Sequence, residues 1–124
     1  MIKAVVTIST IKGYANGSYA VGWNLDQFTN MLQTIEESKF ENTSISWLVT
    51  PGKAVYKTAW GAPEGGEDVF VLSTDYTEYD LQNKLDIDNW KHRVCDHAEY
   101  LRQYFGQTTV RVSFINNVET FILK

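Results

Sequence analysis

The side chains best suited to chemistry gather in one segment of the chain, residues 86–105. This segment contains both histidines, His92 and His97, and the only cysteine, Cys95. Apolar residues recur in it at helical spacing, which predicts an amphipathic helix. At 3.6 residues per turn, the polar side chains fall into two stripes beside the apolar face. The two stripes differ in composition and suggest different kinds of site.

The first stripe holds four side chains that can ligate a metal ion: His92, Cys95, Asp96 and Glu99. Their spacing of i, i+3, i+4 and i+7 places them on one face. One helix seldom supplies a whole coordination shell, and the sequence contains neither HExxH nor CxxC. We therefore interpret this stripe as the solvated face of the helix, and we expect neither a metal site nor a cofactor.

Cys95 has a second interpretation, as a nucleophile. A reactive thiol needs a lowered pKa, which a helix N-terminus or a neighbouring base provides. Cys95 lies near the middle of the segment, and Asp96 beside it acts in the opposite direction. His92 is the one nearby base, and no oxyanion hole is recognisable. We expect an inert surface cysteine and assign no catalytic residue.

The second stripe, here called the helix flank, consists of Arg93, His97, Tyr100 and Tyr104. Arginine recognises phosphate or carboxylate with a planar fork, and histidine adds a donor whose charge changes near neutral pH. Tyrosine stacks on a base. The pattern favours a pocket for a small anionic, nucleotide-like ligand. The alternative is ordinary packing, in which the long stems cover the edge of the core.

Two cations outside the helix complete this hypothetical ligand site. Arg111 lies in the strand predicted to follow the helix, and Lys57 lies in an earlier strand. The glycine-rich stretch 61–66 carries Glu64 and lacks the lysine of a phosphate-binding loop. We therefore interpret that stretch as a hairpin loop.

Composition excludes several classes of protein. A length of 124 residues is typical of one domain, here residues 1–124. A net charge of −4 argues against binding to duplex nucleic acid, which requires a basic surface. No apolar run approaches the roughly 20 residues that span a bilayer, and no leader is recognisable. We expect a cytoplasmic protein with no membrane association.

The elements that must position these residues follow the order ββ-α-βββ-α-ββ. We expect strands at 2–12, 18–23, 44–50, 53–60, 68–74, 108–115 and 118–123, and helices at 24–39 and 86–105. The pairs Asn16-Gly17, Pro51-Gly52 and Asn116-Asn117 are the expected hairpin turns. Residues 75–85 are expected to be irregular.

Both helices carry clear end signals. Asn24 is a predicted N-cap with Gln27 as its capping-box partner, and Asp86 is the predicted cap of the second helix. Gly106 is the residue expected to end that helix.

The result is an α+β fold, one compact domain in which a curved, mostly antiparallel sheet packs around or against two helices. The run at 69–72 is apolar on both faces, as is the run at 121–123. Because two helices cover only one sheet face, we expect strong curvature or a homo-oligomer to cover the other.

Three functional hypotheses remain. The first is a small non-catalytic binding protein that sequesters an anionic nucleotide-like ligand, in the manner of inhibitors from phages and mobile elements. The second is a protein–protein interaction module or inhibitor that binds a protein partner through exposed aromatic residues, such as Tyr14, Tyr19, Tyr76 and Tyr79. The third, a small enzyme with His92 or His97 as its acid–base, has the least support.

Overall fold

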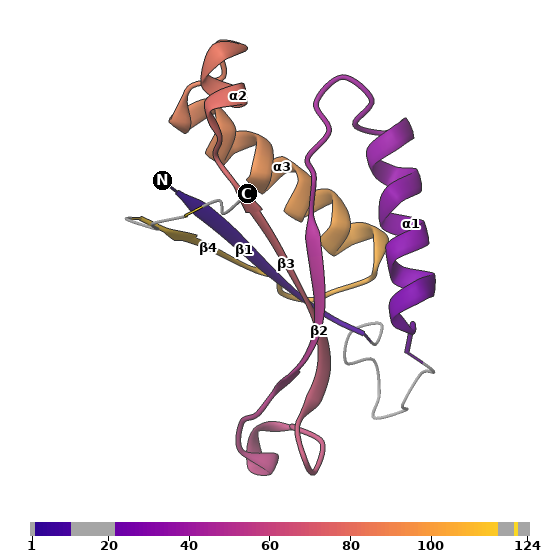
Figure 1. Ribbon diagram of the computed structural model, residues 1–124. Coiled ribbons are helices and arrows are strands. Elements are labelled where there is room, and N and C mark those ends of the chain that lie inside the picture. Colours follow the sequence, from indigo (N-terminus) through magenta and orange to yellow (C-terminus); the bar gives the residue numbers. More distant parts are fainter. Residues whose placement is uncertain (1, 11–21, 117–120, 122–124) are drawn as a thin grey trace.

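The computed structural model describes residues 2–10, 22–116 and 121 (Figure 1). The elements in chain order are β1 (Lys3–Ser9), α1 (Leu25–Ser38), β2 (Leu48–Ala54), the 3₁₀ helix η1 (Thr58–Trp60), β3 (Glu67–Asp75), α2 (Glu78–Gln82), α3 (Ile87–Tyr104) and β4 (Arg111–Ile115).

The strands form one four-stranded sheet in the order β2-β3-β1-β4, and every neighbouring pair is antiparallel. Helix α1 connects β1 to β2 along the chain, and β3 lies between these two strands in the sheet. With α3 linking β3 to β4, this is the split βαβ arrangement called ferredoxin-like. The predicted α+β class and the antiparallel sheet are confirmed.

The core lies between one face of this sheet and the helices α1 and α3. Alternate residues of β1, namely Ala4, Val6 and Ile8, are fully buried. Phe28 of α1 and Leu101 of α3 join them in one apolar cluster. Figure 1 shows α3 crossing one side of the sheet with α1 beside it. The apolar face predicted for segment 86–105 is thus the surface by which α3 meets the sheet.

The opposite face of the sheet, here called the outer face, carries small and β-branched side chains at its centre. Val5 and Thr7 of β1 and Val71 of β3 are partly buried. Leu48 and Ile115, on the two edge strands, are 67% and 46% exposed. The homo-oligomer expected from the sequence to cover this face stays a prediction.

Strands β2 and β3 continue beyond the rest of the sheet as a two-stranded ribbon (Figure 1). The register pairs Lys53 with Asp68 and Ala54 with Glu67, past the last β1–β3 pair of Ser9 and Val69. An ion pair of 2.6 Å between the Lys53 Nζ and the Asp68 carboxylate crosses this ribbon.

The helix ends confirm the predicted caps. The side chain of Asn24 accepts a hydrogen bond from the Gln27 backbone N–H at 2.8 Å, and the Gln27 side chain accepts one from Asn24 N–H at 3.0 Å. Asp86 accepts one from the Asn89 N–H at 2.7 Å. Gly106 adopts a φ of 63°, the left-handed conformation that favours glycine at a helix end.

The turn predicted at Pro51-Gly52 is wrong. Both residues lie inside β2, where Pro51 pairs with Phe70 and Gly52 with Val69. Proline is tolerated there because β2 is an edge strand, and its missing N–H faces away from the neighbouring strand. One strand at 48–54 therefore replaces the two strands expected at 44–50 and 53–60, and η1 follows it.

Two other expectations need correction. The supposedly irregular stretch 75–85 contains α2, which starts with a capping box between Thr77 and Asp80. The strand expected at 108–115 begins only at Arg111. The strands expected at 18–23 and 118–123, with their turns, lie largely outside the described residues. Across residues 2–10 and 22–116, no helix has the length and apolarity that a membrane crossing needs.

We expect Phe28→Ala to destabilise the fold by roughly 3–5 kcal/mol, because a cavity would open in the core. Phe28 is fully buried and contacts two rings, Phe70 and Phe105, at centroid distances of 4.3 and 4.8 Å. Urea unfolding measures the loss. Tyr104→Ala is the control, because Tyr104 is 52% exposed. Equal losses in both variants would contradict this assignment of the core.

Candidate functional site

His97 of the helix flank is buried, with only 1% of its surface exposed. Its Nδ1 lies 2.7 Å from Glu36 Oε1, and its Nε2 lies 2.9 Å from the Thr43 carbonyl oxygen. Phe40 stacks on the imidazole at a centroid distance of 3.6 Å. Both ring nitrogens are thus engaged by protein groups, which links α3 to α1 and to the connection between α1 and β2.

Glu36 is the centre of this buried polar network. Its carboxylate accepts hydrogen bonds from the Ile45 backbone N–H at 3.1 Å and from Trp47 Nε1–H at 2.8 Å. Because a carbonyl only accepts, the Nε2 of His97 carries a proton toward Thr43. The short contact between His97 Nδ1 and Glu36 then requires a further proton between them, as in a buried ion pair.

The other members of the helix flank lie at different depths. Tyr100 is partly buried and meets Phe40 edge to face at 5.5 Å. Tyr104, 52% exposed, stacks on Tyr100 at 6.1 Å. Arg93 is partly buried and, like His97, borders a groove beside α3. The structure thus brings Arg93 and His97 to one groove, while the tyrosines lie further along the helix.

Arg111 and Lys57 lie away from this groove. Arg111 is exposed and alternates along β4 with Val112, which packs against the core, so it points to the outer face. Lys57 lies in the connection between β2 and β3, with its Nζ 5.0 Å from the centroid of the Trp60 ring. The six residues predicted to share a site are therefore not gathered in one place.

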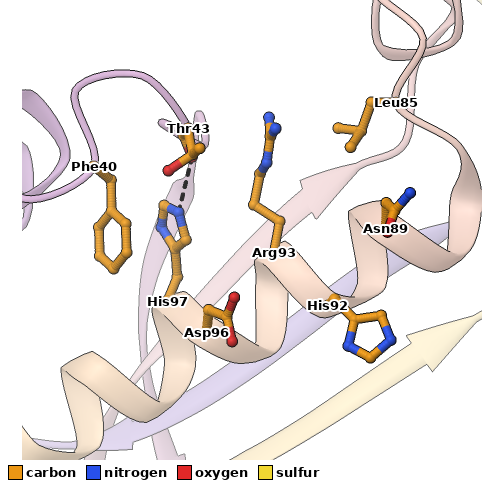
Figure 2. A pocket seen from close by; sticks show the side chains of 8 residues that line it. All are labelled: Phe40, Thr43, Leu85, Asn89, His92, Arg93, Asp96 and His97. Carbon is orange, nitrogen blue, oxygen red and sulfur yellow. Dashed lines mark hydrogen bonds between the residues drawn. The ribbon is translucent and has the colours of Figure 1, made fainter.

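The groove has a volume of about 430 Å³ and lies beside the first half of α3 (Figure 2). The α3 side chains on it include Asn89, Arg93 and Asp96. Phe40 and Thr43 border it from the connection between α1 and β2. In the close-up, Arg93 extends toward the space between Thr43 and Leu85. A groove of this size accommodates a small molecule.

Of the first stripe, His92 and Asp96 border the groove, whereas Glu99 is paired within α3. Glu99 accepts hydrogen bonds from Arg102 Nε at 2.8 Å and Arg102 Nη2 at 2.7 Å, and from Gln103 at 2.9 Å. These bonds, those from Arg102 first, lower the pKa of Glu99 to about 2. Within the described ranges, no three histidine, cysteine or acidic side chains are grouped in a way that would hold a metal ion.

The aromatic residues proposed as a protein-binding surface do not form one surface either. Tyr76 donates a hydrogen bond to the Leu85 carbonyl at 2.6 Å and contacts Trp90 edge to face. Tyr79 is 72% exposed. Tyr14 and Tyr19 lie outside the described residues. Only Tyr79 is therefore available for the proposed contact among those described.

A carboxylate cluster that sequence reasoning missed lies at the base of the β2–β3 ribbon. Ser9 Oγ donates to Glu67 Oε1 at 2.6 Å, and the Tyr56 hydroxyl donates to Glu67 Oε2 at 3.0 Å. All three side chains are partly buried. Ser9 and Glu67 are 58 positions apart, so no local spacing announces the cluster. Only the strand register would have indicated it.

Strand geometry places this carboxylate cluster on the outer face. Glu67 shares a face with Val69 and Val71, because alternate residues of a strand point the same way. Ser9 is paired with Val69 and has the same orientation. Two hydroxyl donors fix the carboxylate plane, and an oriented carboxylate binds a cationic group or accepts a proton.

Comparisons with known proteins reveal a shared fold. No known family model matches the chain, and no curated protein matches it significantly. Two solved structures resemble it over 92% of its length. One is a phage SAM (S-adenosylmethionine) lyase in the apo state, with a TM-score of 0.58, 13% identity and 78% of that chain covered. The other is a phage SAM lyase in complex with S-methyl-5′-thioadenosine, with a TM-score of 0.55, 14% identity and 79% covered.

These comparisons place the chain in a fold that is also found in phage SAM lyase. The fold-level likeness agrees with the part of the leading hypothesis that concerned a phage protein and a nucleotide-like ligand. It differs from that hypothesis in one respect, since the two similar proteins are described as enzymes.

We expect Glu36→Ala to destabilise the protein by roughly 3–5 kcal/mol, because it leaves His97, the Ile45 N–H and the Trp47 N–H without their acceptor. The matched control is Glu37→Ala, which removes an exposed carboxylate from the next position of α1. Urea unfolding distinguishes the two variants. A cost below about 1 kcal/mol for Glu36→Ala would contradict a structural role for the network.

We expect Cys95 to react slowly with iodoacetamide at neutral pH. Partial burial and, secondarily, the charge of Asp96 raise the pKa of its thiol, so little thiolate is present. The thiolate fraction, and with it the alkylation rate, should rise at a higher pH than it does for a free cysteine. Asp96→Asn should shift the rate profile toward lower pH. A fast reaction at pH 7 would contradict the assignment of an inert thiol.

Proposed function

We propose that this protein binds S-adenosylmethionine, or a thioether nucleoside related to it, and cleaves the sulfonium compound with the help of Glu67. The observation that carries the proposal is the carboxylate cluster of Glu67, Ser9 and Tyr56. The shared fold of the phage SAM lyases supports it. The partners expected from this proposal are small molecules.

The chemistry of the substrate matches an oriented carboxylate. S-Adenosylmethionine carries a positive sulfonium and a positive ammonium group, and a carboxylate stabilises a cation best when both are partly shielded from water. Glu67 is partly buried, and its two hydroxyl donors hold it in one orientation. We propose that it contacts the cationic part of the ligand, whereas Ser9 and Tyr56 act as positioning residues.

Cleavage without water has a simple balance. The bond that breaks joins the sulfur to the γ-carbon of the methionine part. Its electron pair stays on sulfur, which becomes the neutral thioether of S-methyl-5′-thioadenosine. The γ-carbon must form a new bond in place of the one to sulfur. Either the neighbouring β-carbon loses a proton and a double bond forms, or the fragment's own carboxylate bonds to the γ-carbon and closes a ring. A fixed carboxylate contributes by accepting that proton or by holding the cationic substrate in the reactive conformation.

The connection between β2 and β3 supplies a surface suited to the base of a nucleoside. Trp60, in η1, is 70% exposed, and an exposed indole stacks on a purine ring. Lys57 and Tyr56 lie on the same connection. Lys57, proposed above from the sequence as a ligand contact, thus lies in the chain segment that also supplies a hydroxyl to Glu67.

We expect the purified protein to convert S-adenosylmethionine to S-methyl-5′-thioadenosine, as measured by liquid chromatography of the nucleosides. Glu67→Gln should lower the rate roughly 100-fold or more, because the carboxamide neither carries the charge nor accepts a proton. The control is Glu64→Gln, an exposed carboxylate in the same connection. Its rate should match that of the wild type.

The outcomes separate the candidate functions. No product from the wild type, together with no rise in melting temperature on adding S-adenosylmethionine, would contradict the proposal. A rise in melting temperature without product would instead favour the non-catalytic protein that sequesters its ligand. Equal rates for Glu67→Gln and Glu64→Gln would show that cleavage does not use the carboxylate cluster.

A further inference from the structure

The groove beside α3 is a second candidate ligand-binding site, and it is separate from the carboxylate cluster. It lies on the side of the sheet covered by helices, whereas Glu67 lies on the outer face. Its residues are not used by the cleavage proposed above.

Arg93 is the main charged group that enters this groove (Figure 2). It is partly buried, and no residue of the described ranges forms a hydrogen bond or ion pair with it. By contrast, Arg102 of the same helix is paired with Glu99. A guanidinium with a free planar fork at the wall of a groove is suited to bind a carboxylate or a phosphate.

The negative charge of Asp96 favours a carboxylate ligand over a phosphate. Asp96 lines the same groove, one helical turn from Arg93, and makes no ion pair with it. A phosphate dianion near Arg93 would be repelled by the Asp96 carboxylate. A zwitterion avoids this repulsion, since its carboxylate meets Arg93 while its ammonium group meets Asp96. The unpaired opposite charges thus match a ligand that carries both charges.

The neutral residues of the groove define the rest of the ligand. Phe40 and Leu85 contribute apolar surface, and Asn89 and Thr43 contribute small polar groups. This combination suits a short apolar side chain attached to a charged head group.

The wall formed by Phe40 and Thr43 is fixed before any ligand binds. The Thr43 carbonyl accepts a hydrogen bond from His97 Nε2, and Phe40 stacks on the imidazole. His97 is in turn held by Glu36. Since binding does not have to order this wall, less binding free energy is lost to entropy.

We propose that this groove binds a small zwitterion, an α-amino acid with an apolar side chain, whose carboxylate is held by Arg93 and whose ammonium is held by Asp96. Occupancy of the groove does not depend on the cleavage activity, so either assignment can fail without the other.

The test is a titration of the ¹⁵N-labelled protein with L-leucine, L-methionine, their methyl esters and their N-acetyl derivatives. We expect saturable shifts of the amide signals of Asn89, Arg93 and Asp96 with the free amino acids. The ester lacks the carboxylate and the N-acetyl compound lacks the ammonium, so each should bind about 10-fold more weakly or worse. Absence of saturable shifts with both amino acids would overturn the proposal.

Two variants separate a zwitterion site from a simple anion site. Arg93→Gln should weaken amino-acid binding about 10-fold or more, while Arg111→Gln, on the outer face, should leave it unchanged. Asp96→Asn should weaken amino-acid binding and strengthen binding of inorganic phosphate. If Asp96→Asn strengthens binding of both, or if the wild type prefers phosphate, the groove is an anion site and the proposal is wrong.

Discussion

The pairing of β1 with β3 is the constraint on which the rest of the structure depends. Its register sends Ala4, Val6 and Ile8 into the core and Ser9 to the outer face. A slip of one residue would reverse every side chain and would expose the core while burying polar groups. The same pairing that forms the hydrophobic core therefore brings Ser9 to Glu67, and fold and carboxylate cluster depend on one set of backbone hydrogen bonds.

A second constraint acts on the helix side of the sheet, where Glu36 and His97 join α1 to α3. A buried charge is costly unless it is paired, and Glu36 meets this requirement with three donors. The pairing also fixes the connection between α1 and β2, because Thr43 bonds to the imidazole. His97 thus borders the groove with both ring nitrogens bonded to protein groups, whereas the guanidinium of Arg93 has no such partner among the described residues.

Local signals in the sequence predicted the helices well, but they did not indicate which distant residues meet. The Asn24–Gln27 box, the Asp86 cap and Gly106 act over three or four residues, so they could be recognised directly. The partners of His97, by contrast, are Glu36 and Thr43, 61 and 54 positions away. The turn predicted at Pro51-Gly52 was wrong for a related reason, because the strand conformation of these residues follows from their pairing with Phe70 and Val69 in β3. In both cases, contacts between residues distant in the sequence determined the structure, and local patterns could not indicate them.

The histidines and cysteine of α3 attract attention because their side chains are reactive in isolation, yet burial and pairing determine what a side chain does. His97 is occupied by two partners, and burial raises the pKa of Cys95. Glu67, inconspicuous among fifteen acidic residues, is instead oriented by two hydroxyls. A fold shared at 13% identity cannot by itself assign chemistry to residues. The proposed function therefore depends on the geometry around Glu67, with the comparison suggesting only which substrate to offer it.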